Sequence, residues 1–378
     1  MNLKETRKNI DKIDSELLKL VSKRMELALR AKKLRNGSNG NGNAESAGNG
    51  TAGNGTTVTS DEEREKEIIT NARKQSIGLV APEFSEKLFR ELIGEAKRVQ
   101  EKGLKLVGFQ GEHGAYGEIA TKSVNPEWVP VPCTEFSDVF EGVKNGQLDL
   151  GIVPVENSLE GAVTQVNDLL VDTELNVIGE IMIPVHHCLL ALPETDYREI
   201  KVVYSHPQAL AQCREFLTRN KLEPRQFYDT AGAAKMLSNE RPKAAAAIAS
   251  KLAAEIYGLD VIKENVEDHP SNVTRFLVLS RDVGSGTGKS EDGNKCSVIF
   301  ETSHKAGSLF RVLKVFADAS INLTRIESRP LRNDPGKYVF LLDFQGSDRE
   351  EAAQRVLDNV KKETMTFKFL GCYKEAKI

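Results

Sequence analysis

The spacing of apolar residues divides the chain into regions of different character. Up to residue 102, apolar residues recur every three or four positions, which is typical of amphipathic helices. Leu3–Arg35 contains no Gly or Pro and predicts one helix about 50 Å long. Its heptad-spaced stripe includes Ile10, Leu17, Val21, Ala28 and Ala31. A capping box of Ser60 and Glu63 predicts a second helix to about Arg73, and a third runs from Pro82 to about Lys102.

After Gly103, short apolar runs alternate with helical segments, the pattern of an α/β architecture. Leu150–Val155 predicts a buried strand, and Glu156, Asn157 and Ser158 follow at its end. Ligands of open α/β sheets bind outside the carboxyl ends of strands, so these three polar residues form a candidate site. A polar loop with Ser158 as a helix cap is the alternative, and spacing alone leaves both open.

Other segments of this region predict further strands, turns and helices. Leu104–Phe109 predicts a strand, and the glycines of Gly111–Gly117 indicate either an anion-binding loop or a tight turn. Ala244–Ile256 is rich in Ala and predicts a helix. His186, His187 and Cys188 contain metal-binding residue types, but three adjacent residues of a strand cannot all face one ion, so no metal is expected.

The last part of the chain predicts a small α+β unit. Val283–Asn294 is expected to be a linker. The order that follows is βαββαβ, a ferredoxin-like unit. Its predicted elements are strands at 296–301, 322–327, 337–344 and 367–370, with helices at 308–319 and 348–360.

Composition narrows the class of protein. The chain has 378 residues, 39% apolar and 28% charged, which suits two or three ordinary globular domains. A net charge of -3 gives no reason to expect nucleic acid or an anionic membrane as a partner. Five scattered cysteines without a Cys-x-x-Cys motif, and no apolar signal-peptide core at the start, indicate a reducing cytoplasm. Residues 36–60 are Gly/Asn/Ser/Thr-rich and predict a flexible linker spanning about 27 Å.

Arg24 and Arg35 lie within the apolar stripe of the first helix, where each needs an anionic partner or reaches solvent at the edge. Residues 1–102 resemble the all-helical chorismate mutase domain, at positions Arg7, Arg24, Asp61, Arg64, Glu65 and Gln100. They differ from that family in Arg35, where Lys is usual, in Ala96, where a hydroxyl is frequent, and in the long linker.

The resemblance to the mutase implies how the residues divide the work. Arg7, Arg24 and Arg64 would clamp the two carboxylates of chorismate. Gln100 and Arg35 would donate to the breaking ether oxygen, and Glu65 would accept from the substrate hydroxyl. Arg7 would come from the partner chain of an intertwined dimer.

Residues 104–281 resemble prephenate dehydratase. The matching stretches are Gly111–Tyr116, Pro154–Ser158, Ser205–Leu210, Asp229–Ala234 and Asn272–Phe276. The family fold implies two α/β lobes resembling a periplasmic binding protein, here 103–184 with 272–282, and 185–271. Glu156, Asn157 and Ser158 would form one wall of the cleft, with Tyr116 binding substrate, and Thr230 and His206 would belong to the other lobe.

The resemblance to the dehydratase also implies a reaction that needs no metal, cofactor or nucleophile. Thr274 would donate to the leaving hydroxyl, and Glu156 is a candidate proton source if burial raises its pKa. Arg275 would bind a substrate carboxylate or pair with a carboxylate of the protein; both alternatives stay open.

The C-terminal unit, 294–378, resembles the ACT regulatory domain. The matching residues are Gly307, Ser308 and Leu309, then Glu327, Ser328 and Arg329 before Pro330. They imply L-phenylalanine binding at an interface between ACT domains. A dimerisation module that binds nothing is the alternative.

Together, the resemblances predict a homo-oligomer, a dimer or tetramer, that takes chorismate to prephenate and prephenate to phenylpyruvate under inhibition by phenylalanine. The alternatives are an arogenate dehydratase, a dehydratase with an impaired mutase domain, and a two-lobed small-molecule sensor.

Overall fold

The computed structural model describes residues 2–39, 61–282, 293–331, 334 and 336–376. The chain forms two compact units, Met1–Leu104 and Lys105–Ile378. Within these described ranges, no helix is long and apolar enough to span a membrane.

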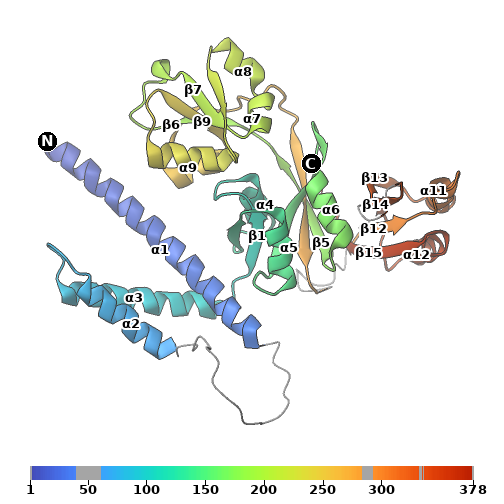
Figure 1. Ribbon diagram of the computed structural model, residues 1–378, viewed down its shortest axis with the longest axis horizontal. Helices are drawn as coiled ribbons and strands as arrows, with labels where there is room; N and C mark the ends of the chain where they lie inside the picture. Colours follow the sequence, from blue (N-terminus) through green and yellow to red (C-terminus); the bar gives the residue numbers. More distant parts are fainter. Residues whose placement is uncertain (1, 40–60, 283–292, 332–333, 335, 377–378) are drawn as a thin grey trace, which may run out of the picture. The chain divides into compact units, whose positions relative to one another are not determined.

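The first unit consists of helices in its described part: α1 (Leu3–Asn39), α2 (Asp61–Lys74) and α3 (Pro82–Glu101) (Figure 1). Both α1 and α2 pack against α3. Proline is favoured at the first position of a helix, which explains why α3 begins at Pro82. In contrast, the N-terminal half of the α1 stripe is uncovered, because Ile10, Ile13 and Leu17 are each about half exposed.

The first helix is longer than predicted. It continues to Asn39, so the first four residues of the expected linker are helical. Glycine costs a helix about 1 kcal/mol but does not block it sterically, so Gly37 does not end α1. The rest of the linker and the predicted cap Ser60 lie outside the described residues.

The second unit begins with a sheet of order β2-β1-β3-β11-β5, to which β4 adds beside β3. Strands β1, β2 and β3 are parallel, whereas β11 runs antiparallel between β3 and β5. A segment distant in sequence thus occupies a central position in the sheet. The elements are β1 (Leu106–Gln110), β2 (Val129–Cys133), β3 (Leu150–Asn157), β4 (Gly161–Ala162), β5 (Asn176–Pro184), β11 (Val273–Ser280), α4 (Tyr116–Val124), α5 (Phe136–Lys144) and α6 (Thr164–Asp172).

A second sheet has the order β10-β6-β9-β7-β8. Its elements are β6 (Cys188–Ala191), β7 (Val202–Ser205), β8 (Glu223–Gln226), β9 (Ala245–Ala249) and β10 (Asp260–Lys263), with η1 (Tyr197–Glu199), α7 (Pro207–Gln212), α8 (Arg214–Arg219), α9 (Thr230–Glu240) and α10 (Lys251–Tyr257). With the first sheet it forms a two-lobed α/β arrangement (Figure 1).

The prediction of one helix over Ala244–Ile256 is wrong. Residues 245–249 form the central strand β9, and the helix begins only at Lys251. All five strand residues are buried, because a hydrophobic cluster covers each face of β9: one contains Ala245, Ala247 and Ala249, and the other contains Ala246 and Ile248. A strand covered on both faces needs a continuous apolar run, and this tertiary requirement overrides the helical preference of Ala.

The third sheet has the order β13-β14-β12-β15 and matches the predicted ferredoxin-like unit. Its elements are β12 (Lys295–Glu301), α11 (Ser308–Asp318), β13 (Leu323–Pro330), β14 (Tyr338–Gln345), α12 (Glu351–Glu363) and β15 (Thr366–Tyr373). This third sheet packs against the first sheet of the Lys105–Ile378 unit through β15 and β5. Of the expected linker, residues 283–292 lie outside the described residues.

Two glycines test the contact between these sheets. A Cβ added at Gly371 on β15 would lie 2.1 Å from the Val177 carbonyl oxygen on β5, and the backbone φ there is +150°. Gly371→Ala should therefore lower the free energy of unfolding by about 1–3 kcal/mol or more, as overpacking does. Gly179→Ala, on β5 itself, is the matched control, because its Cβ would meet Val278 at an ordinary 3.6 Å. Equal denaturation midpoints for the two variants would contradict this packing.

Candidate active and effector sites

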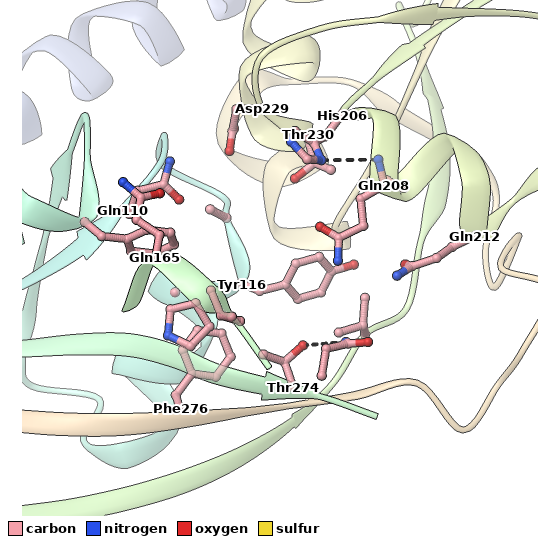
Figure 2. A pocket seen from close by; sticks show the side chains of 18 of the residues that line it. Gln110, Tyr116, Gln165, His206, Gln208, Gln212, Asp229, Thr230, Thr274 and Phe276 are labelled. Atoms are coloured by element: carbon pink, nitrogen blue, oxygen red, sulfur yellow. Dashed lines mark hydrogen bonds between the residues drawn. The ribbon is translucent and has the colours of Figure 1, made fainter. Parts of the chain in front are cut away.

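The first candidate site is a cavity of about 390 Å³ lined by both sheets of the two-lobed region (Figure 2). Five predicted residues line it: Tyr116, Asn157, His206, Thr230 and Thr274. Apolar side chains such as Phe136, Ile152 and Phe276 cover part of the wall. The cavity therefore combines a few polar groups with a partly apolar surface, as small-molecule sites do.

Asn157 and Thr274 form the polar pair at the floor of this cavity. The two residues are register partners on β3 and β11. The Asn157 Oδ1 atom accepts hydrogen bonds from the backbone N–H groups of Leu159 and Glu160, at 3.0 and 3.1 Å. The amide nitrogen is thereby directed at Thr274 and donates to its Oγ1 at 3.0 Å. Because Thr274 accepts this bond, its own hydroxyl hydrogen is available to a ligand.

The orientation of the Asn157 amide also determines the orientation of the side-chain amides that follow it in a row of hydrogen bonds. Asn157 Nδ2 also donates to Asn272 Oδ1 at 2.7 Å, and Asn272 Nδ2 donates to Gln212 Oε1 at 3.0 Å. Gln212 Nε2 then donates to Glu160 at 2.8 Å, which leaves Gln212 Oε1 as an acceptor. His187 Nε2 lies 2.9 Å from that oxygen and must carry the hydrogen. Burial lowers the pKa of His187, which favours the neutral ring with its hydrogen on Nε2.

The wall from the second sheet is built at helix starts. Thr230 is the first residue of α9, and Asp229 caps that helix by accepting from the Gly232 N–H at 2.6 Å. Burial raises the pKa of Asp229. His206 caps α7 through the Gln208 N–H at 3.3 Å. The N-terminal end of α9, an 11-residue helix, favours negative charge, which suits a substrate carboxylate.

Three predicted site residues do not line the cavity. The Glu156 side chain is 47% exposed and lies 3.9 Å from Arg275 Nη1. Ser158 is no helix cap: its Oγ bonds the Ser271 carbonyl and the Val273 N–H, and α6 begins only at Thr164. Arg275 is only 4% exposed and points away from the cavity to carboxylates of the protein. The placement of Arg275 matches the structural alternative, and Glu156 is not among the residues that line the cavity.

The sequence prediction missed several lining residues, among them Gln165, His187, Gln208, Gln212 and Asp229. A signal for two of them was present. Gln208 and Gln212 are four positions apart on α7, the short helix that follows β7, so they share a face of that helix. His187 carried no such signal, because its ring partners, Tyr116 and Gln212, are distant from it in the sequence.

Within the helical unit, several predicted mutase residues contact other parts of the unit. Arg24 donates to the Leu92 carbonyl at 2.9 Å, and Gln100 donates to the Ala28 carbonyl at 2.7 Å. These contacts bring α1 and α3 together at both positions. Glu65 pairs with Lys97 at 2.7 Å, and Arg64 pairs with Glu67 on α2.

The remaining predicted mutase positions are distributed along the helices. Arg7 is exposed near the start of α1, Arg35 lies near its end and is partly buried, and Ala96 is buried on α3. Asp61 begins α2, and its side chain lies outside what is described.

A second cavity, of about 400 Å³, lies in the C-terminal unit and is lined by Gly307, Ser308 and Leu309. Gly307 adopts φ +83°, a conformation that favours glycine, and immediately precedes α11. The other predicted effector residues, Glu327, Ser328 and Arg329, lie on β13 and do not line this cavity. Arg329 pairs with Asp168 of α6 at 2.7 Å.

No group of three His, Cys, Asp or Glu side chains that could hold a metal occurs in the described ranges. The two ring nitrogens of His187 face Tyr116 and Gln212, and His186 Nδ1 faces Glu267 at 2.8 Å. These contacts leave the His186–Cys188 stretch engaged in protein hydrogen bonds.

Three family models match the chain in succession: chorismate mutase type II at residues 6–101, prephenate dehydratase at 107–283, and ACT domain at 297–361. A bifunctional chorismate mutase/prephenate dehydratase of Aquifex aeolicus is 34% identical over 99% of this chain and 98% of its own length. An arogenate dehydratase/prephenate dehydratase of Arabidopsis thaliana is 41% identical over 71% of this chain and 72% of its own length.

One solved structure is similar at 32% identity and a TM-score of 0.65, covering 71% of this chain and 90% of that chain. It is a prephenate dehydratase from Arthrobacter aurescens in complex with L-Phe.

The amide chain leads to a prediction about Asn157. Asn157→Asp replaces the donor to Thr274 and Asn272 by an acceptor, so buried oxygens then face each other. We expect the free energy of unfolding to fall by about 1–3 kcal/mol in urea denaturation. Asn239→Asp, the same change at an exposed position of α9, should stay within about 0.5 kcal/mol of the parent protein. Equal free energies of unfolding for the two variants would show that the hydrogen bonds donated by Asn157 do not contribute to stability.

Proposed function

The chain belongs to the family of bifunctional chorismate mutase/prephenate dehydratases, and on this premise we propose how its sites divide the work. It rearranges chorismate to prephenate and converts prephenate to phenylpyruvate in phenylalanine biosynthesis, under feedback inhibition by L-phenylalanine. The observation that carries the dehydratase assignment is the Thr274 hydroxyl, which accepts from Asn157 and faces the cavity between the two sheets.

Dehydration and decarboxylation of prephenate are driven by formation of the aromatic ring. The ring carboxylate leaves as CO2 and its bonding electron pair enters the ring, while the ring hydroxyl takes up one proton, ultimately from solvent, and leaves as water. The protein must therefore assist the leaving oxygen and hold the carboxylates. Thr274 is the donor to that oxygen in this proposal, and Asn157 increases its donor strength by donating to the same oxygen atom. The start of α9, with Thr230, and His206 form the wall that would receive a carboxylate.

The mutase reaction is unimolecular, so its catalyst holds chorismate in a compact conformer and stabilises charge on the ether oxygen. Arg24, Gln100 and Arg35 are the proposed groups on α1 and α3, with Arg64 and Glu65 on α2. Arg7 lies 17 positions before Arg24 on one helix, which places them about 25 Å apart. The two therefore cannot bind one chorismate from a single chain, and we propose that Arg7 serves the site of a partner chain.

The exposed apolar stripe of α1 supports such an oligomer. Ile10, Ile13 and Leu17 are exposed where a helix of another subunit could cover them. The five cysteines, all among the described residues, form no disulfide with one another, which supports a reducing compartment, the cytoplasm.

For the effector, we propose that L-phenylalanine binds beside Gly307, Ser308 and Leu309, in the cavity of the C-terminal unit. Glu327, Ser328 and Arg329 belong to the strand at the edge of the same sheet, where another ACT domain could approach. An arogenate dehydratase is the second candidate, favoured by the similarity to plant enzymes that carry that name. The mutase domain in the same chain supports prephenate, the direct product of its reaction, as the substrate.

Thr274→Val tests the dehydratase assignment, because it keeps the shape of the side chain and removes the hydroxyl. We expect the rate of phenylpyruvate formation from prephenate to fall by about 10²–10⁴-fold, the usual contribution of a positioned donor. Mutase activity of the same preparation is the internal control and should be unchanged. A normal dehydratase rate in Thr274→Val would remove Thr274 from the mechanism. If the parent protein converts arogenate but not prephenate, the second candidate is favoured.

The shared mutase site is tested by mixing two inactive variants, Arg7→Ala and Arg24→Ala. Each alone should lack mutase activity, because each site would lose one carboxylate clamp. An equimolar mixture after subunit exchange should recover roughly a quarter of the parent activity, because half of its dimers are mixed and one of the two sites of each mixed dimer is intact. Absence of recovery after subunit exchange would show that Arg7 acts within its own chain or not at all.

A further inference from the structure

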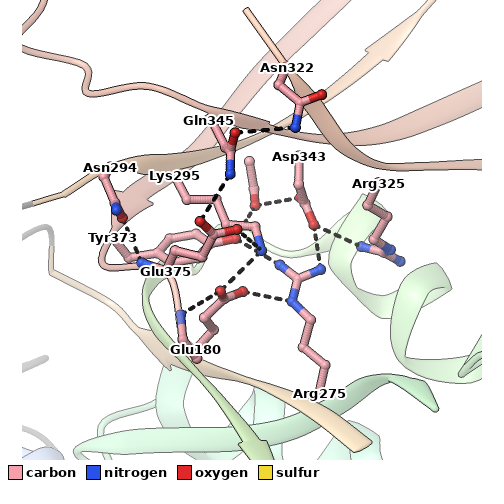
Figure 3. A network of polar contacts seen from close by, with 12 residues as sticks. Glu180, Arg275, Asn294, Lys295, Asn322, Arg325, Asp343, Gln345, Tyr373 and Glu375 are labelled. Atoms are coloured by element: carbon pink, nitrogen blue, oxygen red, sulfur yellow. Dashed lines mark hydrogen bonds and ion pairs between the residues drawn. The ribbon is translucent and has the colours of Figure 1, made fainter. Parts of the chain in front are cut away.

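A cluster of buried ion pairs lies between the C-terminal sheet and the first sheet of the dehydratase region (Figure 3). Its charged members come from both sides: Glu180 and Arg275 on β5 and β11, and Lys295, Arg325 and Asp343 on β12, β13 and β14. Proposed catalysis uses none of these groups directly. Their position raises the question of what they do for the active site.

Arg275 is the member nearest to the reaction. It follows Thr274 on β11, and successive side chains of a strand point to opposite faces. Thr274 therefore faces the cavity, whereas the Arg275 guanidinium reaches Asp343 Oδ2 at 2.6 Å, Glu180 Oε2 at 2.7 Å and the Tyr373 hydroxyl at 3.1 Å. Every nitrogen of this guanidinium thus contacts a partner, and two of the partners belong to the C-terminal unit.

Asp343 connects Arg275 with the strand that carries the effector motif. It is the register partner of Arg325 on β13, and Arg325 Nη1 lies 3.8 Å from Asp343 Oδ2. The other carboxylate oxygen accepts from the Ser297 hydroxyl at 2.6 Å. Although Asp343 is buried, Arg275 and Arg325 lower its pKa, so it stays ionised.

A second connection starts from the same strand and reaches the other half of the catalytic pair. Arg325 Nη2 donates to Asn167 Oδ1 on α6 at 2.5 Å. Asn167 Nδ2 in turn donates to the Val155 carbonyl on β3 at 3.3 Å, two residues before Asn157. Hydrogen bonds therefore connect the C-terminal sheet with both strands that supply the Asn157–Thr274 pair, directly to β11 and through Asn167 to β3.

We propose that Asp343 and Arg325 are positioning residues that transmit effector binding from the C-terminal sheet to the Asn157–Thr274 pair. The inference rests on the proposed function, since it concerns the regulation of that dehydratase site. Tyr338 and Phe340 of β14 line the proposed phenylalanine cavity, and the same strand carries Asp343. A shift of β14 on binding phenylalanine therefore moves Asp343, and with it Arg325 and Arg275. Because buried charges are costly to leave unpaired, Arg275 follows Asp343 rather than separating from it. The donor geometry at Thr274 then changes without any contact between effector and substrate.

Asp343→Asn tests this coupling in the full-length protein, because it keeps the shape of the side chain and removes the charge that holds Arg275. Phenylalanine binding is measured by calorimetry, and dehydratase kcat and KM are measured with and without phenylalanine. Inhibition in the parent protein should fall within the usual coupling range of about 5–150-fold, and the variant should show less than about two-fold inhibition at saturating phenylalanine. Binding of phenylalanine itself should persist.

Two matched variants show whether the effect is specific. Asp318→Asn makes the same change in the same unit, at an exposed residue that pairs only with Lys314 on the outer helix α11 among the contacts described. It should keep full inhibition. Asp343→Glu restores the charge and should recover part of the inhibition, which a merely structural role of the carboxylate in folding would not require. If Asp343→Asn does not fold, Arg325→Met serves instead, because it removes both connections of β13 and should weaken inhibition in the same way.

The outcomes separate this inference from the function on which it rests. If phenylalanine inhibits the parent protein, and inhibits Asp343→Asn and Arg325→Met as strongly as the parent protein, the coupling is wrong and the proposed function stands. If the parent protein does not bind phenylalanine, or if phenylalanine does not change its dehydratase kinetics, the proposed regulation and the coupling both fail. Loss of phenylalanine binding in Asp343→Asn would also overturn the coupling, because Asp343 would then support the effector site itself.

Discussion

The alternation of side chains along β11 is the constraint on which the rest of the structure depends. Thr274 and Phe276 face the cavity, and Arg275 between them faces the C-terminal sheet. Since β11 is inserted between β3 and β5, its pairing register also sets Thr274 opposite Asn157. One strand thus supplies the donor of the proposed reaction, part of its apolar wall and the anchor of the C-terminal unit.

The polar groups around this strand are arranged by the cost of leaving them unpaired. The two backbone N–H groups that bind Asn157 Oδ1 orient its amide, and that orientation passes to Asn272, Gln212 and His187. On the opposite face, burial by itself lowers the pKa of Arg275, but Asp343, Tyr373 and Glu180 outweigh burial and raise it. Both faces are therefore held in one arrangement, neutral on the cavity side and ionic on the other.

Much of this organisation could be predicted from local sequence. The helical, α/β and ferredoxin-like regions follow from the period of the apolar residues, and the three family models match them in the same order. Asn157, predicted at the end of a strand, and Thr230 and Thr274, implied by the resemblance to prephenate dehydratase, line one cavity. In contrast, the alanine run 245–249 was expected to be helical, because its intrinsic preference gives no sign that strands cover it on both sides.

The sequence by itself determined the architecture and the family resemblance, because the period of the apolar residues and the residue types of the motifs are local properties. The donor role of Thr274 was what that resemblance implied. Only the tertiary structure decided which neighbours of those residues reach the cavity. Glu156 and Arg275 have the chemistry of site residues, yet the face of each strand on which they lie turns them away from it. Gln212 and His187 enter the site because a segment over a hundred residues from β3 brings Asn272 beside Asn157. Which face is turned inward, and what distant charge lies opposite it, depends on how the sheets pack, and no local pattern carries that information.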